Sequence, residues 1–297
     1  MSAKQPSPRM AYALLSFASL TWAGNIVLGR AVHATIPPVS LSFWRWVLVL
    51  LILAPFTVKT MIRQRAALRR EWKFLVALGV AGLAGFHTLQ YTALGATTAI
   101  NVALFNAVCP VVIPFFARIL WAERLGPRQA AGIAVSLVGV AVIVLRGDPA
   151  LVLAQGLARG DVIMLGAVAC WSLYVTLLKH RPADLHPNVL LVASIVPAVL
   201  ALFPIWLWEV TTVRTLPLEP MTFLVIGYMG VFAGCLAYIG YGRAVPAIGP
   251  IRAGLFLHLI PLFASLLAIG FLGEHLRLFH MVGAGAIIAG IYLTTRP

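Results

Sequence analysis

Ten long apolar runs divide the chain, and short segments that contain polar and charged residues separate them. A helix needs roughly 20 mainly apolar residues to cross a bilayer. A window of that length finds candidate spans near residues 10–29, 38–58, 73–93, 98–119, 129–146, 160–179, 187–209, 221–241, 250–272 and 279–295. The runs do not alternate with the period of two that a membrane β-barrel requires. The pattern therefore predicts an all-α integral membrane protein with ten transmembrane helices.

The composition supports this prediction. Of the 297 residues, 61% are hydrophobic and 10% are charged, whereas an ordinary soluble domain is about 45–50% apolar and about 25% charged. The net charge of +14 would suggest nucleic-acid binding in a soluble chain. Here the basic residues fall at the ends of apolar runs, so we expect no nucleic-acid partner and a multi-pass location in the inner (plasma) membrane, with the lipid bilayer as partner.

The basic residues also predict the orientation of the chain. Sixteen of the 22 Lys and Arg residues lie on one side if both termini are cytoplasmic, which agrees with the positive-inside rule. The first run lacks a clear small-residue cleavage site, so we expect a retained span and not a signal peptide. Arg45 lies between Trp44 and Trp46 near the predicted outer end of the second helix. It is either a snorkelling arginine in an interfacial belt or a member of a gating ion pair.

The second half of the chain repeats the first. The segment 122–126 (AERLG) matches the segment 273–277 (GEHLR), and each follows a helix with a proline thirteen residues before the glutamate. Trp22 matches Trp171, and the helix that follows each glutamate carries matching glycines. Because each half holds five helices, the second half must enter the membrane from the opposite side. We therefore expect two inverted five-helix repeats, residues 10–150 and 159–297, which is the architecture of secondary transporters.

These paired glutamate turns, the glycine-rich helices after them and the tryptophan in the first helix of each half resemble the EamA family of the drug/metabolite transporter superfamily. The resemblance covers roughly residues 10–296. It implies a ten-helix exporter of metabolites or amino acids, most similar to bacterial exporters of aromatic and other neutral amino acids. It also implies a central cavity lined by helices 1, 3, 4, 6, 8 and 9, with helices 5 and 10 packed peripherally.

Polar and aromatic side chains inside the predicted spans are the candidate substrate-binding residues, because such groups avoid lipid. Several share a helix face through spacings of three or four residues. The candidates are Trp22, Asn25, His87, Gln90, Tyr91, Asn101, Asn106, Trp171, Tyr174, Tyr238, Tyr241 and His258. Each also has a structural interpretation: the Asn and His side chains as links between helices, and the Trp and Tyr side chains as interfacial residues. Trp171 is the leading candidate because it lies midway along its span.

The acidic residues indicate the substrate class by their positions. All eight fall at loops or helix ends, whereas a site for divalent cations or a carboxylate proton relay would keep an acid inside the membrane. The expected substrate is therefore neutral or zwitterionic. Glu123 and Glu274 are expected to cap or order their turns. Gly132, Gly139, Gly283 and Gly290 are expected to allow close helix packing, with a homodimer surface as an alternative.

Export by alternating access as a uniporter is the favoured function, and no metal, cofactor or catalytic residue is expected. A proton-coupled antiporter that uses His87 or His258 is the alternative for energy coupling. An integral-membrane enzyme is a remote alternative, since no nucleophile elbow, phosphate loop or metal-ligand spacing appears. A channel would place rings of like groups in a symmetric assembly, whereas this chain carries its symmetry internally.

Overall fold

The computed structural model describes residues 6–97, 99–145, 148, 150, 159–272 and 277–295. Within these residues ten helical spans are long and apolar enough to cross a membrane. They are Pro8–Val32, Pro38–Arg63, Trp72–Ala96, Leu104–Trp121, Pro127–Val144, Arg159–Lys179, Pro187–Val213, Pro220–Ile248, Pro250–Leu267 and Leu278–Thr295. The predicted all-helical membrane architecture is confirmed.

Several spans are built from consecutive helical elements. The first half contains α1 (Pro8–Val32), α2 (Pro38–Arg63), α3 (Arg65–Arg70), α4 (Trp72–Ala77), η1 (Leu78–Gly85), α5 (Phe86–Ala96), α6 (Ala99–Asn106), α7 (Cys109–Trp121) and α8 (Pro127–Val144). The second half contains α10 (Arg159–Lys179), α11 (Pro187–Trp208), η2 (Glu209–Val213), α12 (Pro220–Tyr228), η3 (Met229–Leu236), α13 (Ala237–Ile248), α14 (Pro250–Leu255), η4 (Phe256–His258), α15 (Leu259–Leu272) and α16 (Leu278–Thr295). Proline begins α1, α2, α8, α11, α12 and α14, where its missing N–H costs no hydrogen bond.

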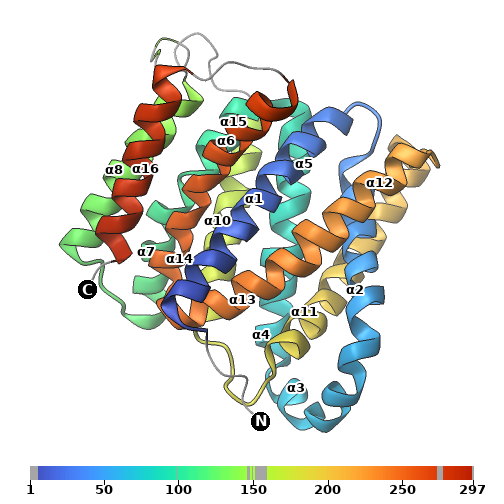
Figure 1. Cartoon of the computed structure of the whole chain (residues 1–297). Coiled ribbons are helices and arrows are strands. Elements are labelled where there is room, and N and C mark those ends of the chain that lie inside the picture. Colours follow the sequence, from blue (N-terminus) through green and yellow to red (C-terminus); the bar gives the residue numbers. More distant parts are fainter. Residues whose placement is uncertain are drawn as a thin grey trace.

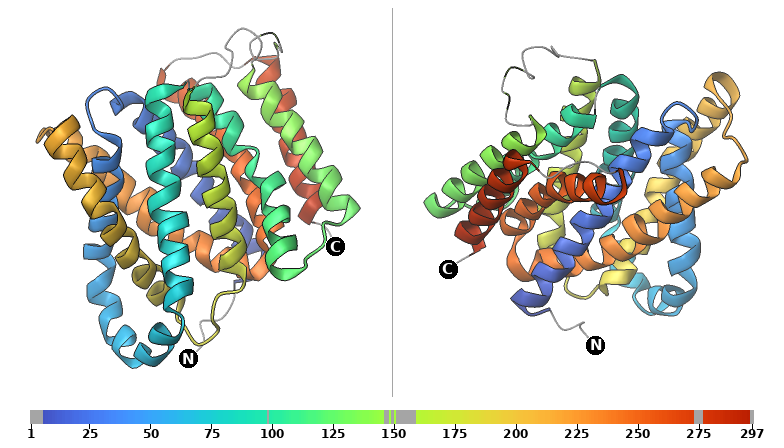
Figure 2. Two further views of the ribbon diagram at one scale, coloured as in Figure 1. Left: turned by 180° about the vertical axis from the view of Figure 1, so that it is seen from behind. Right: turned by 45° about the horizontal axis from the view of Figure 1, so that its top comes forward.

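The two halves pack against each other in a reciprocal pattern. Helix α1 of the first half contacts α13 and α15 of the second half, and α10 of the second half contacts α5 and α7 of the first. Two further pairs, α2 with α11 and α8 with α16, join equivalent helices of the two halves. This is the packing that a two-fold axis between inverted repeats produces, and Figures 1 and 2 show the halves interleaved in one helical bundle.

The third span of each half contains a π-helical segment at the same place. η1 and η3 are each eight residues long and begin at Leu78 and Met229, which are related by the same spacing of about 150 residues as the other repeats. Such segments widen the helix and often occur at functional sites. His87 and Tyr238 each follow the end of such a segment by two residues.

Glycines join α8 to α16. A Cβ atom on Gly139 would lie 2.7 Å from the carbonyl oxygen of Gly283, and one on Gly132 would lie 2.7 Å from that of Gly290. The prediction that these four glycines allow close helix packing is confirmed. The alternative of a dimer surface is wrong for them, because their faces meet within the chain. The pair lies at one edge of the bundle (Figure 1), as the family resemblance implied.

The surface of the bundle is apolar over much of its length, with exposed side chains such as Phe56, Leu200 and Phe223. α1 begins and α16 ends at the same end of the bundle (Figure 1), which we call the termini end. The side of the membrane that this end faces stays a prediction.

Candidate functional site

Five aromatic side chains meet at the centre of the bundle. This aromatic cluster consists of Trp22, Trp171, Tyr174, Tyr238 and Tyr241, and each is at most 6% exposed. The ring centroid of Trp22 lies 5.1 Å from those of both Trp171 and Tyr241, and Trp171 lies 5.3 Å from Tyr174. Both halves contribute rings, so the cluster forms only when the repeats pack together.

A cavity lies between the aromatic cluster and the end of the bundle opposite the termini, and we call it the far cavity. Its free volume in this conformation is about 20 Å³, room for about one water molecule, so a larger ligand requires the cavity to widen. Its lining is Trp22, Asn25, Ile26, Phe86, His87, Gln90, Asn106, Trp171, Leu257 and Ile260. The cavity thus brings together six of the predicted site residues from both halves. They are Trp22 and Asn25 of the first span, His87 and Gln90 of the third, Asn106 of the fourth and Trp171 of the sixth. The four apolar lining residues were not predicted, because nothing in their sequence separates them from other buried aliphatic and aromatic positions.

One arginine lies directly behind the wall of this cavity. Arg45 is fully buried in α2, and its Nη1 donates hydrogen bonds to Tyr91 Oη at 2.6 Å, to His87 Nδ1 at 3.1 Å and to Asn25 Oδ1 at 3.4 Å. Tyr91 Oη in turn donates to Asn25 Oδ1 at 2.9 Å. The guanidinium carbon also lies 5.0 Å from the ring centroid of Trp46, a cation–π contact.

Both predicted interpretations of Arg45 are wrong. The side chain does not snorkel to an interface, because none of it is exposed. It does not belong to an ion pair either, since none of the salt bridges found among the described residues includes it. Arg45 lies seven residues after Pro38, the first residue of the apolar helix α2. This depth is the sequence signal that distinguishes it from an arginine in an interfacial belt.

The Arg45 contact sets the tautomer of His87. A guanidinium can only donate, so His87 Nδ1 must accept and its N–H must lie on Nε2. Nε2 then donates to Tyr238 Oη at 2.8 Å, and Tyr238 Oη donates to the carbonyl oxygen of Gly82 at 3.2 Å. A directed chain of hydrogen bonds thus runs from Arg45 in one half to Tyr238 in the other.

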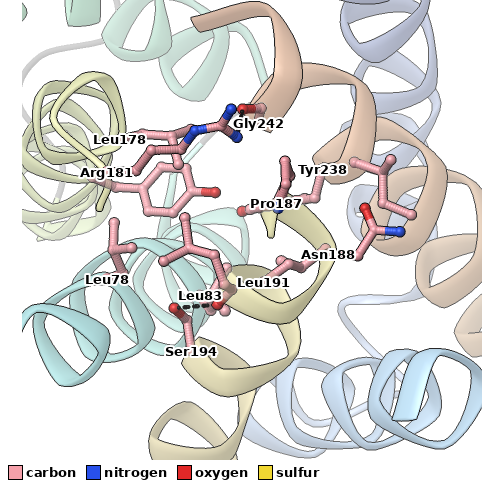
Figure 3. A pocket seen from close by; sticks show the side chains of 13 residues that line it. Leu78, Leu83, Leu178, Arg181, Pro187, Asn188, Leu191, Ser194, Tyr238 and Gly242 are labelled. Atoms are coloured by element: carbon pink, nitrogen blue, oxygen red, sulfur yellow. Dashed lines mark hydrogen bonds between the residues drawn. The ribbon is translucent and has the colours of Figure 1, made fainter. Parts of the chain in front are cut away.

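A second cavity, the near cavity, lies between the aromatic cluster and the termini end, and Figure 3 shows the side chains that line it. Its free volume is also about 20 Å³, and it is lined in part by Tyr174, Ser194, Tyr238 and Gly242. The repeat relates Tyr174 and Tyr238 to Asn25 and His87 in the lining of the far cavity, and Ser194 to Arg45 behind it. The near cavity also has a charged side chain, Arg181, whose Nη1 lies 3.4 Å from the carbonyl oxygen of Gly242.

An ion cluster joins the two halves at the termini end. Glu123 Oε1 accepts hydrogen bonds from Lys179 Nζ at 2.7 Å and from His180 Nε2 at 3.2 Å. Burial raises the pKa of the Glu123 carboxyl, but the hydrogen bonds and charges of Lys179 and His180 outweigh it and hold that pKa below its usual value. Glu123 was expected to order its own turn, and the structure instead shows it bound to the end of α10. Glu274 lies outside the described residues.

The remaining candidates occupy different places. Tyr241 packs in the aromatic cluster, and Tyr91 lies behind the wall with Arg45. His258 is fully buried away from the cavities, where Nδ1 lies 2.6 Å from Ser136 Oγ and Nε2 lies 2.8 Å from the carbonyl oxygen of Ala107. These contacts make His258 a link between helices. The side chain of Asn101 lies outside the described residues.

Comparison with known proteins gives the family. The family described as "EamA-like transporter family" matches residues 9–145 and again residues 158–296. The chain belongs to the EamA-like transporter family. The two matched segments are the two halves whose reciprocal packing is described above, and the predicted resemblance is confirmed.

Relatives of this EamA-like chain have transporter names. An "Uncharacterized transporter YyaM" of Bacillus subtilis is 24% identical over 278 residues, which cover 94% of this chain and 90% of that protein. A "Probable terminal-alkyne amino-acid exporter" of Streptantibioticus cattleyicolor is 25% identical over 247 residues, 76% of this chain and 74% of that protein. A solved crystal structure with 19% identity matches with a TM-score of 0.77 over 97% of both chains, and so shares the fold. The EamA-like chain is therefore a multi-pass membrane transporter, and its family does not support an enzyme.

Proposed function

We propose that this EamA-like protein exports small neutral or zwitterionic metabolites, with amino acids, including aromatic ones, as the substrates. The observation that carries the proposal is the far cavity, which combines two tryptophan faces with amide and imidazole groups and has no acidic residue in its lining. The name of the Streptantibioticus relative adds support for an amino-acid substrate.

The lining suits both parts of an aromatic amino acid. Trp22, Phe86 and Trp171 offer ring faces that attract an ammonium group by about 0.5–2 kcal/mol or a second ring by about 0.5–1.5 kcal/mol beyond burial. Asn25, Gln90 and Asn106 offer amide groups to the polar end of the substrate. Each contact is modest, which suits a carrier that must release what it binds.

Two cavities on either side of one aromatic cluster support transport by alternating access. Tyr174 and Tyr238 of the near cavity are related by the repeat to Asn25 and His87 of the far cavity, and the cluster between the cavities is buried. If the repeats exchange conformations, one cavity widens while the other closes, and the rings of the cluster part as the substrate passes. Arg181 at the near cavity provides a positive charge for a substrate carboxylate at the termini end.

The hydrogen bonds of His87 support uniport over proton coupling. A proton on His87 Nδ1 would remove the lone pair that accepts from Arg45, and it would place a second positive charge 3.1 Å from Arg45 Nη1. His258 is held by Ser136 and Ala107 outside both cavities. Neither histidine is therefore well placed to take up and release a proton in each cycle.

Transport by the purified protein in liposomes tests the proposal. The assay measures the uptake of labelled phenylalanine, tryptophan, leucine and alanine, with a divalent cation as the control, with and without a pH gradient. We expect saturable amino-acid flux that the gradient does not drive uphill. Uphill accumulation would establish the proton-coupled antiporter, flux without saturation would indicate a channel, and selective flux of the cation would overturn the substrate class.

A further inference from the structure

Arg45 is a buried charge without a countercharge in the described chain. Its side chain is fully buried, and among the described residues no carboxylate lies within salt-bridge distance of it. An arginine stays protonated in proteins, and a buried charge is costly unless it is paired. All three of its hydrogen-bond partners are neutral side chains.

The guanidinium is also only partly engaged. Nη1 makes all of its hydrogen bonds, whereas Nε and Nη2 have no acceptor. The buried acid on the neighbouring helix, Glu209, is bound to Ser40 instead. The fork that would hold a carboxylate by two parallel hydrogen bonds therefore remains free on one side.

The cavity next to Arg45 presents a further unpaired donor. Asn25 and His87, which accept from Arg45, both line the far cavity. Asn106 lines it from α6, is 5% exposed, and its Nδ2 has no hydrogen-bond acceptor. The unsatisfied groups at this side of the cavity are thus donors, and a ligand that accepts hydrogen bonds would satisfy them.

The repeat shows that the fold does not need this charge. The position equivalent to Arg45 in the second half is Ser194, at the same spacing of 149 residues that relates Trp22 to Trp171. Ser194 Oγ donates to the carbonyl oxygen of Leu190 in its own helix at 2.8 Å (Figure 3). The same packing position between helices is therefore filled in the other half without a charge.

We infer that Arg45 anchors the carboxylate of the substrate. The inference rests on the proposed function, and it makes the far cavity selective for carboxylates. The carboxylate takes the place of the neutral acceptors Asn25 and His87 on Nη1 of Arg45 and receives a further hydrogen bond from Asn106. In the absence of substrate, Asn25, His87 and Tyr91 hold the guanidinium in place.

Ligand binding to the purified protein tests this inference directly. The probes are phenylalanine, 3-phenylpropanoate, which lacks the ammonium group, and phenylalaninamide, which lacks the carboxylate. Thermal-shift titrations compare the wild type with Arg45→Gln. Arg30→Gln is the matched control, because Arg30 lies on α1 and bonds to the carbonyl oxygen of Leu94, outside the far cavity.

We expect the wild type to bind the two carboxylates at least tenfold more tightly than the amide. Arg45→Gln should abolish that preference, since hydrogen bonds to charged groups are worth about tenfold or more in affinity. Arg30→Gln should keep the preference. If Arg45→Gln does not fold, Arg45→Lys, which keeps the charge and loses the fork, should show a reduced preference.

Three results would overturn the inference: equal binding of amide and carboxylates by the wild type, no binding of any probe, or an unchanged preference in the Arg45 variants. Transport of phenylalanine by the wild type in liposomes separates the two proposals. Phenylalanine flux without a carboxylate preference keeps the proposed function and removes the role of Arg45. A carboxylate preference that depends on Arg45, without any amino-acid flux, keeps the role of Arg45 and removes the proposed transport of amino acids.

Discussion

Glu209 holds the beginning of α2 through Ser40. Glu209 Oε2 accepts two hydrogen bonds from Ser40, from the backbone nitrogen at 2.6 Å and from the hydroxyl at 2.8 Å, while Oε1 accepts from the backbone nitrogen of Val39 at 3.0 Å. A carboxylate at a helix N-terminus satisfies unpaired N–H groups and opposes the helix dipole. Glu209 thereby joins the seventh span to the second at the end of the bundle where Arg45 lies.

Replacement of Glu209 should destabilise this junction. Glu209→Ala leaves the first amides of α2 without an acceptor, so we expect a loss of about 1–3 kcal/mol in the free energy of unfolding, seen as a lower melting temperature in detergent. Glu219→Ala is the matched control, because Glu219 begins α12 without a side-chain cap hydrogen bond. Equal melting temperatures for the two variants would contradict the role given to Glu209.

Trp171 is the aromatic residue of the far cavity with the most ring contacts, and a conservative change should weaken transport. Trp171→Phe keeps an apolar ring, but the smaller ring loses part of its contact with Trp22, Tyr174 and Tyr238. One aromatic pair is worth about 0.5–1.5 kcal/mol, so we expect amino-acid flux to fall by about 2- to 12-fold. Trp208→Phe is the control, since Trp208 is 58% exposed on the bundle surface. Undiminished flux in Trp171→Phe at equal protein level would remove Trp171 from the pathway.

The contact between α8 and α16 leaves no room for a methyl group. Gly139→Ala places a Cβ 2.7 Å from the carbonyl oxygen of Gly283, and we expect overpacking to cost about 1–3 kcal/mol. Gly285→Ala on α16 meets nothing within 4 Å and should be neutral or stabilising, because alanine favours helix more than glycine does. Melting temperatures that fall equally in both variants would show that helix packing here is not tight.

The Glu123 cluster predicts a pH dependence of stability. Because the pKa of Glu123 is held below its usual value in the folded protein, its contribution to stability is fully present above the unfolded pKa of about 4.3 and is lost as the pH falls through the lower folded pKa. We expect Glu123→Gln to melt below the wild type at pH 6 and the gap to shrink below about pH 4. Glu219→Gln, an exposed acid, should show no such gap. A gap between Glu123→Gln and the wild type that stays constant with pH would exclude the ion cluster as its cause.

Hydropathy predicts the fold of this chain well because the thickness of the bilayer fixes the length of each span. The repeat then determines how the spans pair, since matched positions such as Trp22 and Trp171 meet across the central axis. The same reasoning placed Asn25, His87 and Asn106 together, because polar groups in lipid-embedded helices turn toward a shared interior.

Other features depend on contacts that no local pattern encodes. The tryptophans on either side of Arg45 are typical of an interfacial belt, and only the packing of α1 and α5 around α2 buries the guanidinium. His258 has the residue type of a site histidine, but its partners Ser136 and Ala107 come from distant parts of the chain. The π-helical segments η1 and η3 arise from backbone hydrogen bonds one residue out of the usual register, which residue types alone do not specify.

The buried aromatic cluster has a consequence for the cell that carries this protein. Bulky buried rings in mutual contact form a septum between the two cavities. In the conformation described here, an ion that enters one cavity meets packed rings and not the other cavity. Under the proposed uniport, metabolites would leave down their own gradients, and the packed rings would limit the loss of the electrochemical potential across the same membrane.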